Sequence, residues 1–370
     1  MEKERRKKLF DALTTPTLAI IAGLLVASVL ILLADASPIE AYKTILTSSF
    51  GCASLERCSF FATLERATPL ILTGLSAVVA FRSGIFSLGQ EGQMMLGSIT
   101  AAWLGYAILL PAGIHPIVIM LASMAVGGFY GWIPGVLKIR LGVNEIISTI
   151  VMNSIAVLFL EYIVNFPLRA DAGASAHSHI IHETAWLPIF FKGSKWGMGF
   201  VVAMVAAIAV FYFLWHSAAG YQQRMSGEAP LFAKFGGIPN ERIAIRSMII
   251  SGALAGLAGS IEVLGVHHRI ITGFSVGLGF DGLSVAILGQ SHPLGVVIVA
   301  ILLAGVRLGA QLGLQIQLGI PRELGGTIIA LFIFFVAAEK FFKNNIDAMR
   351  KLQAKYFGKK EKAPVAGEES

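Results

Sequence analysis

Long apolar runs separated by short polar segments dominate this chain. A helix that crosses a bilayer needs roughly 20 mostly apolar residues, and about ten runs approach that length. They cover residues 17–34, 68–81, 93–110, 116–137, 144–163, 198–216, 245–264, 277–289, 294–312 and 323–338. The runs at 68–81 and 277–289 are too short for a full crossing, so we expect them either to extend into flanking residues or to be broken helices that line a cavity. The pattern predicts an all-α, polytopic membrane helix bundle of about ten transmembrane helices.

Composition supports a membrane protein over a soluble one. Of the 370 residues, 55% are hydrophobic and 14% are charged, whereas a soluble domain is nearer 25% charged. The mean hydropathy is +0.74, and one soluble core could not hide that much apolar surface. The net charge of +7 comes from loops and tails, where basic residues report membrane topology. We therefore expect membrane lipids as partners and no nucleic acid.

The distribution of Lys and Arg predicts the orientation of the chain. If the N-terminus is cytoplasmic, most of the 29 basic residues fall on the cytoplasmic side, as the positive-inside rule requires. Both termini are then cytoplasmic. We expect a cytoplasmic segment at 1–16, a membrane domain at 17–342 with outer loops at about 35–66 and 165–197 and a cytoplasmic loop at 217–246, and a cytoplasmic tail at 343–370.

Polar residues stand at the start of the third apolar run. Gln90, Glu91 and Gln93 follow the polar link after residue 81. A carboxylate within a bilayer costs up to ~3 kcal/mol, so it favours a water-filled cavity or a partner. The alternative is that Glu91 lies at a helix N-terminus, where the helix dipole stabilises a negative charge. The first reading makes all three residues candidates for a solute pathway.

A second polar stripe lies on the run at 144–163. Asn144, Ser148 and Asn153 fall near one face at helical spacing. Such a stripe suits the passage of a hydroxylated solute. The alternative is hydrogen bonding between helices, which polar residues in membranes often provide.

The run at 277–289 echoes the one that begins near Glu91. Asp281 is followed by glycine and then by apolar residues, as Glu91 is. In the predicted topology the two elements enter the membrane from opposite sides. This arrangement predicts an inverted internal repeat, with solute handled between the halves and Asp281 as a further pathway residue.

Small residues recur at a spacing of four within two of the runs. Gly127, Gly131 and Gly135 form one series, and Gly252 and Gly256 form another. Each series lies on one helix face, where small side chains let backbones approach closely. We expect these glycines to pack helices together.

Motifs for chemistry within the chain are weak. Residues 273–277 fit the G-x-S-x-G pattern, but a nucleophile elbow needs a preceding strand. The histidines at 177–182 match no strong metal-binding pattern, and no phosphate-binding G-x-x-x-x-G-K-[ST] motif occurs. We therefore expect no catalytic residue, no metal site and no cofactor in this chain. Cys52 and Cys58 could pair in an oxidising compartment.

The cytoplasmic loop contains a short amphipathic helix. Pro230 suits the first turn of a helix. Leu231, Phe232 and Phe235 then form an apolar face, and Gly236 and Gly237 suit its end. Such a helix fits a groove on a partner protein, or it lies on the membrane surface.

Several of these segments together resemble the permeases of ABC importers for branched-chain amino acids, simple sugars and nucleosides. The resemblance covers residues 68–341 and is closest to the nucleoside-transporting branch, through residues 87–93 and 288–295 taken together. The segments that carry it are 81–97, 142–153, 227–246, 251–263 and 279–295.

The resemblance implies that the short helix couples this chain to a separate ABC ATPase subunit, which binds the ATP. It also implies a second permease chain, either identical or a paralogue, an extracytoplasmic solute-binding protein, and a location in the bacterial plasma (inner) membrane. Residues 226–238 lack the Asn-Pro of the family pattern, which leaves the start of the coupling helix open. The implied coupling residues are Glu228, Leu231, Phe232, Lys234, Phe235 and Gly237.

The expected function is therefore ATP-driven import of nucleosides, in particular purine nucleosides, or of related small polar solutes by alternating access. Simple sugars are the alternative within the same class. An ion-coupled transporter or channel that needs no ATPase is the alternative from another class. An intramembrane enzyme would need a convergent set of polar groups that the sequence does not display.

Overall fold

The computed structural model describes residues 25–29, 31–32, 36–54, 57–170, 176–191, 196–273, 277–317, 319, 326–327 and 330. Apart from links, isolated bridges and one small hairpin, these residues are helical, so the all-α prediction is confirmed. The chain divides into two units, Met1–Ala41 with Leu318–Ser370, and Tyr42–Gln317. The second unit contains the helices described below, apart from Pro38–Ala41 at the start of α2. The predicted spans at 17–34 and 323–338 lie largely outside the described residues.

Six helices among the described residues are long and apolar enough to cross a bilayer. The shorter helices α4 (Gln90–Ala107) and α11 (Leu278–Leu288) accompany them. The predicted total of about ten stays a prediction, because two of the runs are not described. The six are α3 (Ser59–Phe81), α5 (Ile114–Leu141), α6 (Glu145–Asn165), α7 (Met198–His216), α10 (Asn240–Ile261) continued by η2 (Glu262–His267), and α12 (Pro293–Gly309) continued by η3 (Ala310–Gln317).

The two short runs of the sequence have different structures. The run at 68–81 extends towards the N-terminus to Ser59, because Leu64 and Ala67 continue its buried apolar face. The run at 277–289 is an 11-residue helix, α11, that follows irregular backbone. The run at 277–289 is therefore part of a broken helix, which was one of the two expected structures.

Helix α3 is the buried centre of the unit Tyr42–Gln317. It contacts α7, α10, α11 and α12, and most of its residues are shielded from solvent. Helices α5 and α6 instead expose apolar side chains such as Phe129 and Leu158. This difference is expected where outer helices face lipid.

Helices α5 and α10 pack backbone to backbone. A Cβ atom on Gly127 would collide with the backbone of Gly252 and Gly256, and a Cβ atom on Gly256 would collide with that of Ser123. The predicted role of these glycines in close helix packing is confirmed. The contact fixes α10 against α5 along the length that leads into η2.

The segment predicted as the first outer loop contains regular structure. Helix α2 (Pro38–Phe50) precedes a hairpin of β1 (Cys52–Ser54) and β2 (Arg57–Cys58). A disulfide joins Cys52 to Cys58 across the hairpin. The sequence left this pairing open, and the structure forms it.

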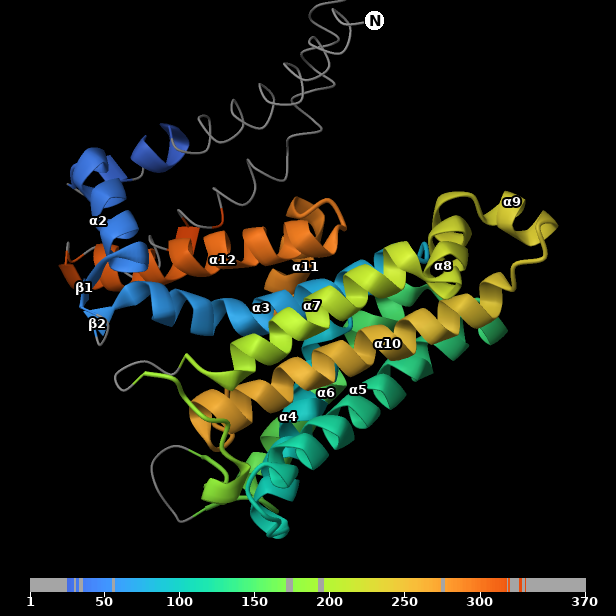
Figure 1. Cartoon of the computed structure of the whole chain (residues 1–370), viewed down its shortest axis with the longest axis horizontal. Coiled ribbons are helices and arrows are strands. Elements are labelled where there is room, and N and C mark those ends of the chain that lie inside the picture. The colour runs from blue at the N-terminus through green and yellow to red at the C-terminus, as the bar shows by residue number, and fades with distance from the viewer. Residues whose placement is uncertain are drawn as a thin grey trace, which may run out of the picture. The chain divides into compact units, whose positions relative to one another are not determined.

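Helices α8 (Ala218–Glu228) and α9 (Pro230–Phe235) lie at the end of the bundle where α10 begins (Figure 1). The Ser217 hydroxyl caps α8 by accepting a hydrogen bond from the Gly220 amide at 3.0 Å. Pro230 opens α9, and Gly237 follows its end with φ of +76°. The short helix predicted in the cytoplasmic loop is therefore present.

Candidate functional site

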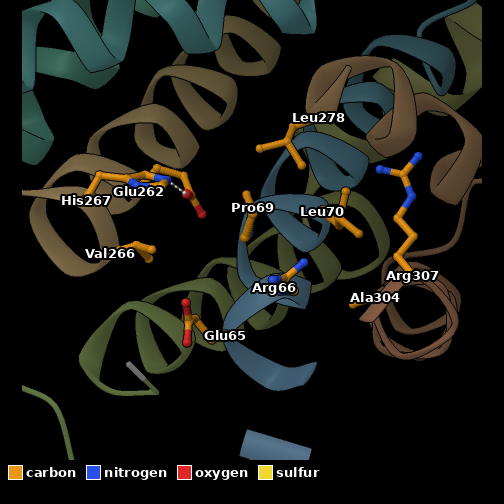
Figure 2. A pocket seen from close by; sticks show the side chains of 10 residues that line it. All are labelled: Glu65, Arg66, Pro69, Leu70, Glu262, Val266, His267, Leu278, Ala304 and Arg307. Atoms are coloured by element: carbon orange, nitrogen blue, oxygen red, sulfur yellow. Dashed lines mark ion pairs between the residues drawn. The ribbon is translucent and has the colours of Figure 1, made fainter. Parts of the chain in front are cut away.

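A cavity of about 280 Å³ lies between α3, η2, α11 and α12. Its wall is partly apolar and includes Leu70 and Val266 (Figure 2). The remaining wall carries ionisable side chains, which is unusual within apolar spans and typical of a functional pathway. These side chains are Glu65, Arg66, Glu262, His267 and Arg307.

The ionisable residues are held in place from several helices. His267 Nε2 lies 3.4 Å from Glu262 Oε2, one π-helical turn away. Arg66 donates a hydrogen bond of 2.7 Å from Nη1 to Gln311 Oε1. Arg307 forms an ion pair with Asp281 on α11. The cavity is bordered both by the end of η2, through His267, and by the start of α11, through Leu278.

Glu91 binds the N-terminus of a different helix. Its carboxylate accepts hydrogen bonds from the backbone amides of Gly277, at 2.9 Å, and Gly279, at 2.6 Å. These amides belong to the start of α11, where helical N–H groups lack partners and the dipole favours a negative charge. The carboxylate on α4 thus caps α11, and the absence of a Cβ atom on Gly279 lets the two backbones approach.

Replacing Glu91 with glutamine should destabilise the protein. The amide retains one acceptor but loses the charge-assisted bonds to α11, at a cost of about 1.5 kcal/mol. The melting temperature of the purified protein in detergent measures this loss. An unchanged melting temperature combined with lost uptake would instead favour the pathway role predicted for Glu91.

Asp281 is mostly buried and lies in the first turn of α11. Glu91 also lies in the first turn of its own helix, α4. Both helices follow a longer helix and an irregular link. The inverted repeat stays a prediction. Asp281 forms an ion pair with Arg307 of α12, whereas Glu91 of α4 binds backbone amides at the start of α11.

The polar stripe on α6 is divided between different roles. The Asn144 side chain is exposed and caps α6 by accepting a bond from the Ile146 amide at 2.8 Å. Ser148 is buried, and its hydroxyl donates a 3.2 Å bond to the Glu145 carbonyl within α6. Asn153 accepts a bond from the Gly92 amide at 2.9 Å and donates one to the Leu88 carbonyl at 2.7 Å.

Asn153 therefore links α6 to the start of α4. This is the hydrogen bonding between helices that was the alternative to a solute pathway. None of these three residues lines the cavity of Figure 2. Gln90 and Gln93 also lie outside its wall, and each is only 1% exposed. Within the described residues, neither polar atom of the Gln90 side chain has a hydrogen-bond partner. The pathway role of all five residues stays a prediction.

The apolar face of α9 is open to its surroundings. Leu231, Phe232 and Phe235 are 73%, 65% and 91% exposed. Asn240 at the start of α10 donates a 2.8 Å bond to the Pro230 carbonyl, which ties both ends of the loop around α9. The helix therefore presents exposed aromatic rings on a closed loop. Lys234 adds an exposed positive charge.

An arginine connects this end of the bundle to the cavity helices. Arg82, which follows α3, donates a 2.9 Å bond to the Ser291 carbonyl in the turn before α12 and lies 3.3 Å from Glu228, the last residue of α8. Burial, and then the charge of Arg82, lowers the pKa of the His292 imidazole. A neutral imidazole can accept the bond that His292 Nδ1 receives from the Leu294 amide at the start of α12.

The residues that line the cavity were missed by reasoning from the sequence. Glu65, Glu262 and Arg307 each stand inside an apolar helix. Ionisable residues within membrane spans are themselves a signal of function. That signal was present in the sequence, although it does not indicate which of these residues share a cavity. Among the described residues, no group of three His, Cys, Asp or Glu could hold a metal ion.

Comparison with known proteins places this architecture in a family. The family model for the branched-chain amino acid transport system permease component matches residues 59–337. The guanosine ABC transporter permease protein NupP of Bacillus subtilis is 36% identical over 90% of this chain and 94% of its own length. The nucleoside ABC transporter permease protein NupB of Lactococcus lactis is 29% identical over 88% of this chain and 90% of its own length.

A third relative is named for a different solute. The glucose ABC transporter permease protein of Haloferax volcanii is 28% identical over 89% of this chain and 88% of its own length. No solved structure matches the chain significantly. The family match and the long apolar helices agree with the resemblance seen in the sequence. The chain belongs to the family of branched-chain amino acid transport system permease components and is a multi-pass membrane transport protein.

Proposed function

We propose that this chain is the membrane-spanning subunit of an ATP-driven importer of nucleosides. Two of its relatives are named as guanosine and nucleoside permeases, and the alignments cover most of both chains. The ATPase would be a separate chain, joined by a second permease copy or paralogue and an extracytoplasmic solute-binding protein. The complex would lie in a bacterial plasma membrane, with α9 and both termini of this chain on the cytoplasmic side.

The exposed apolar face of α9 is the observation that carries this proposal. A membrane transporter that worked alone would not need Phe232 and Phe235 to be exposed on a closed loop. A short helix of this kind fits a groove on a partner. The ATPase would move α9, and the contacts of Arg82 with Glu228 and Ser291 would carry the movement towards α12.

Transport would proceed by alternating access without covalent chemistry. The cavity is lined by α3 and α12 and by the two sides of the break between η2 and α11. Broken helices around a central site are the usual means by which transporters expose a site to one side and then the other. Solute would enter from the side opposite α9 and leave towards it.

Replacing both Phe232 and Phe235 with alanine should abolish coupling while the fold remains. Removal of two aromatic anchors from a docking face typically costs at least about 2 kcal/mol of binding free energy, so uptake and co-purification of the ATPase should both fall. Melting of the isolated chain should not change, because the rings contact solvent. Nucleoside uptake by the reconstituted complex and retention of the ATPase on purification measure the effect.

Phe166→Ala is the matched control, because Phe166 is 70% exposed and follows the last residue of α6. It should retain both uptake and the ATPase. Full uptake by the double variant would contradict the coupling role of α9. Accumulation of nucleosides by the lone chain in liposomes would contradict the ATP-driven importer and favour the ion-coupled alternative.

A sugar is the second candidate solute, because one relative is named for glucose. Competition of labelled guanosine uptake by unlabelled nucleosides and by pentoses or glucose distinguishes the two. Nucleosides alone should compete if the proposal is correct.

A further inference from the structure

We propose that the cavity reads the base of the nucleoside and selects guanine through the carboxylate of Glu262. This inference rests on the proposed import of nucleosides. It identifies the base as the part of the nucleoside that this chain recognises. None of the pathway residues suggested by the sequence lines this cavity, so the assignment concerns a different set of side chains.

Glu262 is a carboxylate in an otherwise shielded position. It is 6% exposed, and it opens the π-helical segment η2. Burial of a charge is unfavourable unless a partner compensates it. His267 approaches only one oxygen, Oε2. We assign Oε1, the oxygen that this ion pair does not use, as the acceptor for a solute in the cavity that Glu262 borders.

A second carboxylate lies on the same side of the cavity. Figure 2 shows Glu65 of α3 and Glu262 of η2 flanking the space between these two elements. Both residues, with Val266, also border a smaller adjoining cleft of about 20 Å³. Arg307 of α12 borders the far side, where its guanidinium pairs with Asp281 and keeps further N–H groups as donors. The cavity therefore has acceptors on one side and a cationic donor on the other.

Guanine matches this distribution of hydrogen-bonding groups. Its N1–H and N2–H₂ groups are adjacent donors, and an ionised carboxylate is an acceptor at both oxygens. Its O6 and N7 atoms are the acceptors that arginine binds best. Adenine presents an acceptor at N1 beside its N6 donor, so one of its edge atoms would face a carboxylate unfavourably. Leu70 and Val266 supply apolar surface for the ring.

The size of the cavity limits the solute that it can hold. Its volume of about 280 Å³ is close to the lower end of the roughly 300–1,000 Å³ of ligand pockets. This suits one nucleoside.

Glu262→Gln in the complete reconstituted transporter tests the assignment. A carboxamide offers one acceptor and one donor, which matches the edge of adenine and not that of guanine. We expect guanosine uptake relative to adenosine uptake to fall by about tenfold or more, since a mismatched polar group is strongly rejected. The binding protein is the same in every variant, so a changed ratio comes from this chain.

Glu161→Gln is the control, because Glu161 is exposed on α6. It should keep the wild-type ratio. An unchanged ratio in Glu262→Gln, or an equal loss of both solutes in folded protein, would overturn the inference. If Glu262→Gln does not fold, Glu65→Gln takes its place with the same expected direction, and an unchanged ratio there counts against the inference. Absence of any nucleoside uptake by the wild-type complex would instead contradict the proposed function.

Discussion

Gly256→Ala is expected to prevent stable packing of α5 against α10. The added methyl group would meet the backbone carbonyl of Ser123 and the Cα atom of Gly127. Backbone atoms cannot rotate away as a side chain can, so the helices must separate. Overpacking of this kind costs about 1–3 kcal/mol, and more where the neighbours cannot move. We expect a large fall in the melting temperature and in the yield of monodisperse protein from detergent.

Gly265→Ala provides the matched control in the continuous helix formed by α10 and η2. The nearest atoms to its Cβ position belong to the Leu187 side chain at 3.7 Å, an ordinary van der Waals distance. Alanine also favours helix over glycine by about 1 kcal/mol. The control should therefore match or exceed the wild-type melting temperature. Equal stability of Gly256→Ala and the wild type would contradict the close packing of α5 and α10.

Arg307→Met should destabilise the protein by about 3 kcal/mol. This is the low end of the range for loss of one partner from a buried ion pair, because the Arg307 side chain is 36% exposed. The methionine fills similar space but leaves the carboxylate of Asp281 buried in α11 without its partner. The melting temperature and the urea or detergent sensitivity of the purified chain measure the loss.

Neutralising Asp281 as well should restore most of the lost stability. The combination of Arg307→Met with Asp281→Asn removes both charges, and paired removal is often nearly neutral. The four proteins form a double-mutant cycle that isolates the interaction between the two residues. A double variant no more stable than Arg307→Met alone would show that Arg307 acts through contacts other than Asp281.

The spans of this bundle could be predicted from the sequence because apolar length is a local property. Helix α7 has the predicted bounds, Met198–His216, and α9 begins at the predicted proline. Helix α2 was missed, since residues 38–50 are short and flanked by the polar positions typical of a loop. The disulfide of Cys52 could be proposed from the sequence but not decided.

The candidate site was harder to predict because its contacts are long-range. The sequence left Glu91 open between a pathway carboxylate and an acid at a helix N-terminus. Its partners in the structure are the amides of Gly277 and Gly279, separated from it by 186 and 188 positions. Every residue except proline has a backbone amide, so the sequence does not show which amides a carboxylate binds. Asn144 has helical spacing with Asn153, but its position one residue before α6 makes it a cap. Periodicity identifies a shared face and does not show which end of the helix is exposed.

The bond between Glu91 and α11 determines where the bundle can bend. Separating α4 from α11 would leave a carboxylate and two amides stranded in a medium that cannot solvate them. We therefore expect α4 and α11 to move together as one rigid unit. We expect hinges instead at η2 and η3, where π-helical winding interrupts the regular α-helix of α10 and α12. If α10 and α12 flex there while α4 and α11 stay together, the cavity would open and close.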